Sequence, residues 1–162
     1  MKDVNVTSDL LVEIGQLQNR YVRCIDADRI EDWPRLFTDD GFYSVTSAEN
    51  HRAGLQAGLI WLDGIGMIKD RVTALRDANV YERHSYRHIV GQPYVVGHDE
   101  TGDIQAETAF FVVRITRDGL TDVFATGNYL DTLRHVDSTL KFARRVVVCD
   151  SSHIDTLLGL PL

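Results

Sequence analysis

Two histidines four residues apart are the first side chains in this sequence that could do chemistry. His84 and His88 would share one face of a helix, and their even spacing would also put them on one face of a strand. With Glu82 nearby, they offer the two imidazoles and a carboxylate that zinc or ferrous iron accepts. No further ligand stands at a metal-site spacing, so we expect the imidazoles to form hydrogen bonds within a sheet or at a subunit contact.

Three further side chains could join these histidines in a pocket: Asp26, Asp28 and Tyr43. Small isomerases and dehydratases need a carboxylate or imidazole base, and a phenol or acid that stabilises an enolate. The simpler interpretation is that the two aspartates end a helix, because short acidic side chains bond readily to free backbone groups. The residues alone leave both interpretations open.

The basic and sulfur-containing side chains argue against an anion-binding site and against a redox centre. Arg144 and Arg145 are neighbours, so in a strand their side chains lie on opposite faces, where we expect ion pairs with acidic residues. The two cysteines, Cys24 and Cys149, form no C-x-x-C motif and would not form a disulfide in a reducing compartment. An iron–sulfur cluster needs four ligands, and a Rieske centre needs two cysteines and two histidines in paired spacing. We therefore expect no redox cluster in this chain.

Length and charge narrow the class of protein. The chain has 162 residues, which predicts a single domain over 1–162. Its 24 acidic and 17 basic residues give a formal net charge of -7, which argues against nucleic acid and anionic membranes as partners. The apolar runs are far shorter than a membrane span, and residues 1–6 lack the features of a signal peptide. We expect a cytoplasmic protein.

Helical patterns dominate the first half of the chain. Apolar residues recur every three or four positions from Leu10 to Ile25, which predicts an amphipathic helix that ends near Asp26. A second short helix is expected around Trp33, with Pro34 in its first turn. The expected elements that follow are a turn at 39–41, a strand at 42–46, a short buried strand at 55–61 and a helix capped by Asp63 that runs to Leu75.

Strand patterns dominate the second half. Segments rich in β-branched and aromatic residues are separated by turn-like intervals, and Asp118-Gly119 is the strongest hairpin signal. The expected strands are 88–96, 104–116, 121–133 and 140–149. Helices followed by long antiparallel strands predict an α+β fold, with a strongly curved antiparallel sheet around the N-terminal helices.

An apolar segment closes the sequence. Leu157, Leu158, Leu160 and Leu162 surround Pro161, and leaving so many leucines in water would be unfavourable. The segment must therefore pack on the chain's own sheet or on another subunit, and the sequence favours neither.

The order and spacing of several stretches resemble the small (β) subunits of aromatic-ring-hydroxylating dioxygenases, and the likeness covers nearly the whole chain. The stretches are residues 70–76, 81–91, 121–125 and 144–151. Shorter matches are Trp33-Pro34, Asn50-His51, Gly54-Leu55, Ala57-Gly58, and Asp155-Thr156-Leu157 with Leu160-Pro161-Leu162.

This resemblance implies a cone-shaped fold of the nuclear-transport-factor-2-like type, and a role in assembly. In that family a larger α subunit carries the Rieske [2Fe-2S] cluster and the mononuclear Fe(II), commonly in an α3β3 hexamer, and a reductase delivers electrons from NAD(P)H. The chain itself would then hold no catalytic, cofactor-binding or metal-binding residue. The expected substrate of the holoenzyme is an aromatic carboxylate, terephthalate, converted to a cis-dihydrodiol. The alternative is a stand-alone cone-shaped isomerase or dehydratase with Asp26, Tyr43, His84 or His88 as acid and base.

Overall fold

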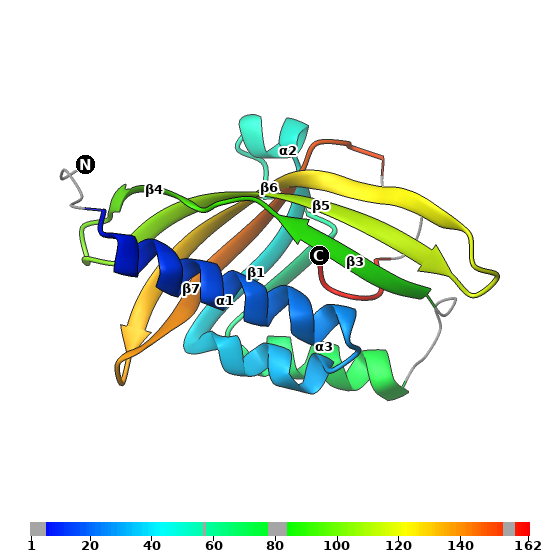
Figure 1. Ribbon diagram of the computed structural model, residues 1–162, viewed down its shortest axis with the longest axis horizontal. Coiled ribbons are helices and arrows are strands. Elements are labelled where there is room, and N and C mark those ends of the chain that lie inside the picture. Colours follow the sequence, from blue (N-terminus) through cyan, green and yellow to red (C-terminus); the bar gives the residue numbers. More distant parts are fainter. Residues whose placement is uncertain (1–5, 57, 78–83, 154–157) are drawn as a thin grey trace.

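A computed structural model describes residues 6–56, 58–77, 84–153 and 158–162, and its main feature is one strongly curved sheet (Figure 1). The strands are β1 (Phe37–Ser47), β2 (Ile60–Asp63), β3 (His84–Val90), β4 (Tyr94–His98), β5 (Ile104–Thr116), β6 (Thr121–Val136) and β7 (Thr139–Cys149). Their order is β2-β1-β7-β6-β5-β3, and β4 also pairs with β5. The expected α+β arrangement is confirmed. The sheet is mixed, because β1 runs parallel to β7 while the other pairs are antiparallel.

The predicted amphipathic helix is α1 (Ser8–Asp26). The hydroxyl of Thr7 accepts a hydrogen bond from the backbone N–H of Leu10, which satisfies one of the free donors at the start of the helix. Its apolar face, from Ile14 to Ile25, is buried. Figure 1 shows α1 and α3 (Ile65–Asp77) under the arch of the sheet, while α2 (Ala48–Arg52) lies on its other side. None of the helices in the described part of the chain is long and apolar enough to cross a membrane.

The short element around Trp33 is a 3-10 helix, η1 (Ile30–Leu36), with Pro34 inside it rather than in its first turn. Proline has no backbone N–H to donate at that position, so a regular α-helix does not continue through it. Trp33 is fully buried and packs edge-on against Phe37 and Tyr43, with ring centroids 5.5 and 5.0 Å apart. Through Trp33, this element contributes to the aromatic part of the core.

The turn predicted at 39–41 is wrong, because these residues lie within β1. The pairing of β1 with β7 shifts between Phe37 and Phe42, so the turn-forming residues are accommodated as an irregularity in a continuing strand. Asp40 faces outward there and forms an ion pair with Arg134 on β6, with 3.0 Å between Nη1 and Oδ2. A side chain at Gly41 would approach the Thr38 carbonyl oxygen to 2.8 Å, so the irregularity needs glycine.

Two other predicted boundaries also differ. The strand expected at 88–96 is two strands, β3 and β4, which pair with different parts of β5. Pro93 lies between them and cannot donate to a ladder. Asp63 does not cap α3. It is the last residue of β2, which begins only at Ile60, and Gly64, with φ of +89°, separates it from the helix.

The β5–β6–β7 meander follows the predicted segments closely. Strand β5 has the expected bounds, and Gly119 supplies positive φ (+86°) in the expected hairpin. The hairpin between β6 and β7 is tighter. Val136 pairs with Thr139, and the two residues between them, Asp137 and Ser138, have φ of 49° and 62°. This is the backbone of a two-residue hairpin turn with left-handed central residues.

Candidate functional site

The structure joins one of the proposed acid–base pairs. Asp26 ends α1, and its carboxylate accepts two hydrogen bonds from His88 on β3: one from the backbone N–H at 3.0 Å, and one from ring Nδ1 at 2.6 Å. The His88 side chain is fully buried and that of Asp26 is 9% exposed. Asp26 therefore does more than end the helix. It ties α1 to an outer strand of the sheet, 62 positions away in the sequence.

The other members of the predicted pocket lie in different surroundings. Asp28 faces solvent and forms an ion pair with Arg76 of α3, with 2.8 Å between Oδ1 and Nη1. His84 is half-buried, and its ring contacts Tyr86, the residue between the two histidines on the same face of β3. Glu82 lies outside the described residues. Tyr43 binds the C-terminal segment, so the structure pairs Asp26 with His88 and not with Tyr43.

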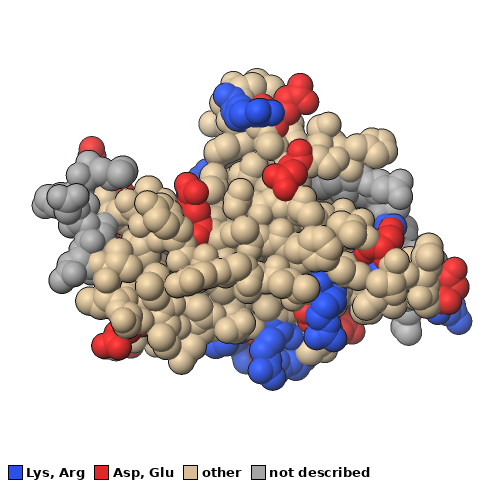
Figure 2. Space-filling model, turned by 45° about the horizontal axis from the view of Figure 1, so that its top comes forward, with Lys and Arg blue, Asp and Glu red and all other residues tan. Residues whose placement is uncertain are grey.

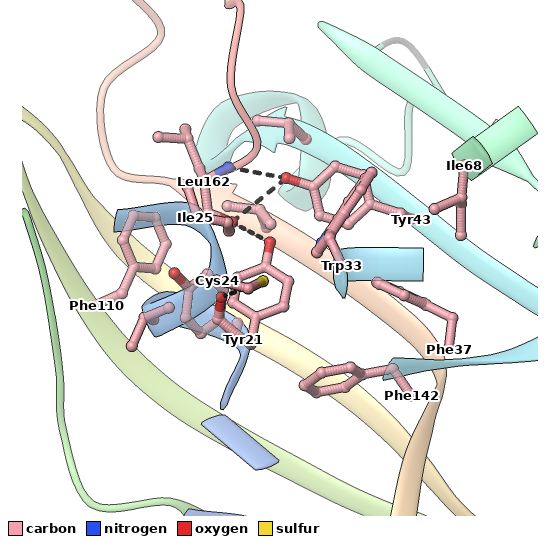
Figure 3. Packing of buried hydrophobic residues seen from close by; sticks show 14 of the residues in the cluster. Tyr21, Cys24, Ile25, Trp33, Phe37, Tyr43, Ile68, Phe110, Phe142 and Leu162 are labelled. Atoms are coloured by element: carbon pink, nitrogen blue, oxygen red, sulfur yellow. Dashed lines mark hydrogen bonds between the residues drawn. The ribbon is translucent and has the colours of Figure 1, made fainter. Parts of the chain in front are cut away.

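The described part of the apolar C-terminal segment packs inside this chain's own fold. Leu158, Leu160 and Leu162 are buried, while Leu157 lies outside the described residues. Figure 3 shows two phenol groups directed at Leu162: Tyr21 donates to its carbonyl oxygen at 2.5 Å, and Tyr43 accepts from its N–H at 3.0 Å. Of the two docking sites that the sequence allowed, the structure shows the chain's own sheet.

Burial makes these phenols poor proton donors and acceptors for a reaction in water. Burial raises the pKa of Tyr43 to about 12, against which the hydrogen bond with Tyr21 acts only partly. Burial also raises the pKa of Tyr21 well above its ordinary value, and the nearby Tyr43 adds to this rise. Both hydroxyls serve to hold the C-terminal segment. Arg71 of α3 holds it from the other side by donating to the carbonyl oxygens of Leu158 and Gly159.

A polar network that the sequence analysis did not identify lies in the core. Arg145 on β7 is fully buried and donates to both carboxylate oxygens of Asp131 on β6, at 2.8 and 2.7 Å. It also donates to the side-chain oxygen of Gln18 on α1. The Gln18 amide in turn donates to Asp131 at 2.7 Å and to the Thr108 hydroxyl at 3.2 Å. The network therefore joins one helix to three strands.

Three aromatic rings surround the buried guanidinium. The central carbon of Arg145 lies 4.1 Å from the ring centroid of Tyr21 and 4.0 Å from those of Tyr129 and Phe142. Burial alone would lower the pKa of Arg145, but the charge and hydrogen bonds of Asp131 outweigh it and raise the pKa above the ordinary value. The ion pairing expected for Arg145 is confirmed, and the pair lies in the core.

The sequence does contain a signal for this network. Inward-facing positions of β6 alternate from Ala125 through Tyr129 to Leu133, and Asp131 occupies one of them. Gln18 lies next to Leu17 on the buried face of α1. Polar residues in phase with a core-facing pattern are expected to find partners, because a buried polar group without one is costly. Their pairing with Arg145 needs the strand register, which no local pattern gives.

The opposite face of the sheet carries several exposed apolar side chains. As expected, Arg144 lies on the other face from Arg145, where its guanidinium stacks over Phe42 at 4.0 Å. Toward the other edge, Ile89 and Val123 are each 61% exposed, and Phe111 is opposite Ile89 in the ladder. Figure 2 shows uncharged residues over much of the face turned forward, with acidic and basic side chains scattered among them. Exposed apolar side chains that lie close together are one mark of a protein interface.

The thiols and potential metal ligands show no assembled centre in the described ranges. Cys24 and Cys149 are free and buried. Burial raises the pKa of each to about 12. Among the described residues, no three or more His, Cys, Asp or Glu side chains are grouped so that they could hold a metal ion.

Comparison with known proteins gives one consistent result. The profile of the family described as ring hydroxylating beta subunit matches residues 20–156. The chain is 46% identical, over 93% of its length and 97% of the relative's, to subunit beta 2 of the terminal oxygenase component of terephthalate 1,2-dioxygenase from a Comamonas species. It is 37% identical to the anthranilate 1,2-dioxygenase small subunit of Burkholderia cepacia, over 98% of this chain and 99% of that one.

A solved structure agrees with these sequence matches. It is a crystal structure from Novosphingobium aromaticivorans, of a chain assigned as the β subunit of an aromatic-ring-hydroxylating dioxygenase. The TM-score is 0.85 at 34% identity, covering 94% of this chain and 96% of that one.

Proposed function

Because the chain belongs to the family of ring-hydroxylating β subunits, we propose that it is the non-catalytic small subunit of a dioxygenase that acts on an aromatic carboxylate, most specifically terephthalate. The observation that carries this proposal is the 46% identity to a terephthalate 1,2-dioxygenase β subunit over 93% of the chain. Its partner would be a larger α subunit, in an α3β3 hexamer. That subunit would hold the Rieske cluster, the mononuclear iron and the aromatic ring.

The chemistry of the proposed holoenzyme assigns this chain a supporting role. Both atoms of dioxygen would enter the ring as hydroxyl groups of a cis-dihydrodiol, and NAD(P)H would supply two electrons through a reductase. In this chain Leu158, Leu160 and Leu162 are buried, and Tyr43, the phenol suggested for catalysis, hydrogen-bonds with Leu162. The exposed apolar side chains of Ile89 and Val123 on the outer face of the sheet support a role in assembly.

One observation favours a second candidate, a stand-alone isomerase or dehydratase. The carboxylate of Asp26 orients the ring of His88, and Nε2 of that ring is buried with no hydrogen-bond partner among the described residues. A carboxylate-oriented imidazole is a common general base. We rank this candidate second because Tyr43, its expected acid, hydrogen-bonds with Leu162 and not with His88 or Asp26.

Purification of the chain from its native host under mild conditions tests the two candidates against each other. We expect a brown complex that contains iron and an equal amount of a larger subunit, with the mass of a hexamer by light scattering. The complex should oxidise terephthalate with NAD(P)H and the reductase. A colourless, iron-free assembly of this chain alone would overturn the proposal and favour the second candidate.

A preference of the complex for another aromatic acid would leave the subunit role intact and correct the substrate. Turnover of terephthalate, anthranilate and benzoate should therefore be compared on the same preparation, because the sequence relatives include a subunit of an anthranilate enzyme.

A further inference from the structure

A hollow of about 580 Å³ on the outer side of α1 and η1 is lined mainly by positively charged side chains. Its lining includes four arginines, Arg20, Arg23, Arg29 and Arg35, and a single acidic residue, Asp32. The formal charge of these five residues is +3, whereas the whole chain carries -7. The remainder of the chain therefore carries -10, so the hollow is a local cationic region on an acidic protein.

Two of the four arginines have no ion-pair partner in the described part of the chain. Asp32 is shared by two arginines, Arg35 at 2.8 Å and Arg29 at 3.8 Å. No ion pair or hydrogen bond from the side chains of Arg20 and Arg23 to the described residues is found, and both are exposed. They are three positions apart on α1, a spacing at which like charges destabilise a helix by a few tenths of a kcal/mol.

The chemistry of the lining favours carboxylates. A guanidinium presents a planar fork of donors that matches a carboxylate in two parallel hydrogen bonds. The side-chain amides of Gln16 and Asn19 stand beside the arginines and can donate as well. The basic side chain of Arg23 also suits the last turn of α1 through the helix dipole, but Arg20 lies almost a turn earlier and gains less from it.

The exposure of the arginines favours a partner with several carboxylates over a single small anion. One exposed ion pair contributes at most about 1 kcal/mol, because water and salt screen it. Several pairs on one segment act together and also speed the encounter of two oppositely charged surfaces. Nucleic acid and anionic membrane fit poorly, because the surrounding -10 would repel their extended phosphate surfaces.

We infer that this arginine hollow receives an acidic segment of the α subunit, with Arg20 and Arg23 as its main contacts. The inference rests on the proposed function and deepens it by naming a contact surface and the charge of its occupant. It predicts that salt weakens the assembly of the two subunits, because the pairs at the hollow are solvent-exposed and therefore screened.

The test compares charge reversals in the co-expressed α–β complex. The double variant Arg20→Glu/Arg23→Glu removes two positive charges at the hollow and adds two negative ones. A matched control, Arg52→Glu/Arg117→Glu, makes the same change at exposed arginines on α2 and in the β5–β6 hairpin. Subunit dissociation is followed by light scattering from about 50 mM to about 300 mM NaCl, and circular dichroism of each complex verifies that the fold is kept.

We expect the hollow variant to raise the dissociation constant at least tenfold at the lowest salt and to flatten its dependence on salt. The control should stay within about twofold of wild type. The milder variant Arg20→Gln/Arg23→Gln should fall between the two, which separates loss of charge from repulsion.

Results of two kinds would overturn the inference. One is wild-type assembly and an unchanged salt dependence in the hollow variant, or equal weakening in the control. The other is normal assembly of the hollow variant together with loss of terephthalate binding by this chain, which would assign the hollow to a free dicarboxylate. If the wild-type chain forms no complex with an α subunit at all, the proposed function fails instead, so the two failures are distinguishable.

Discussion

At the scale of single residues, the most consequential group is the guanidinium of Arg145. It lies in the core with no exposed surface, and its charge is balanced by Asp131 and by the faces of three aromatic rings. Removing an ion from water costs several kcal/mol, and this cost is recovered only when the partner and the hydrogen bonds stay in place. The intact pair therefore adds little net stability, but the loss of either partner would destabilise the fold strongly.

Replacement of Arg145 by methionine should lower the free energy of unfolding by about 3–5 kcal/mol, because it leaves the Asp131 carboxylate buried without its counter-charge. The double variant Arg145→Met/Asp131→Leu should recover much of that loss. Urea unfolding followed by circular dichroism measures both.

The control for this prediction is the exposed ion pair between Arg35 and Asp32, whose side chains are 78% and 41% exposed. Arg35→Met should change stability by less than about 1 kcal/mol. A loss of similar size at Arg35 and Arg145 would contradict the importance that we give to burial.

The buried thiols and phenols give the protein a defined alkaline limit. Burial raises the pKa of Cys24 and Cys149 from 9.0 to about 12, and that of Tyr43 from 10.0 to about 12. The native state favours the protonated forms, so this stability is complete below about pH 9 and is lost as the pH rises toward 12. Urea midpoints at pH 8, 10 and 11 should fall in that order, and constant midpoints would show that the groups are accessible.

The same pKa values predict inert thiols. At pH 8 both thiols therefore stay almost entirely protonated in the native state, and the protonated thiol is a poor nucleophile. Alkylation by iodoacetamide should therefore be negligible in the native protein and rapid in guanidinium chloride.

At the scale of elements, local patterns predicted most of the structure. The periodic apolar face of α1 and the β-branched run of β5 each gave an element close to its observed bounds. The errors at residues 39–41 and 88–96 have a common physical reason. At 39–41 a turn was predicted where the strand continues, and at 88–96 one strand was predicted where residues 91–93 interrupt it. In both places only the pairing with β7 or β5 decides whether the strand continues.

The turn between β6 and β7 predicts a stabilising change. Asp137 and Ser138 both have positive φ, which asparagine and glycine adopt with less cost. The variant Asp137→Asn/Ser138→Gly should raise the free energy of unfolding by about 0.5–1 kcal/mol, measured by urea unfolding.

In the β5–β6 hairpin, the opposite substitution should destabilise the protein. Gly119 already has glycine at positive φ (+86°), so Gly119→Ala should lower stability by about 1 kcal/mol. If both variants change stability in the same direction, the conformation of the turns is not the cause.

At the scale of the whole molecule, the site was harder to predict than the fold. The sequence singled out Asp26, His88 and Tyr43, and all three are engaged in long-range hydrogen bonds. It could not say which of them meet, because the curvature of the sheet brings the end of α1 to β3 and the C-terminal segment to β1. Gln18 and Asp131 were missed for the same reason, since their partner lies on another strand.

The Asp26–His88 pair gives a prediction for the assembled enzyme. Asp26→Asn and His88→Ala should each lower the stability of this subunit by about 1–3 kcal/mol, because each leaves a buried polar group without its partner. Turnover per assembled complex should stay within about twofold of wild type, measured on complexes matched for iron content. A variant that assembles with full iron but has no turnover would favour a chemical role for the pair.

The contacts that close the core also determine how this chain must fold. Tyr21 and Leu162 are 141 positions apart, and the parallel pairing of β1 with β7 joins Phe42 to Arg144. The β5–β6 and β6–β7 hairpins are local and can form early, whereas contacts of such high sequence separation form late and slowly. Before the last described residues reach Tyr21 and Tyr43, the apolar surface that they cover is open to water, and exposed apolar surface of this kind promotes aggregation.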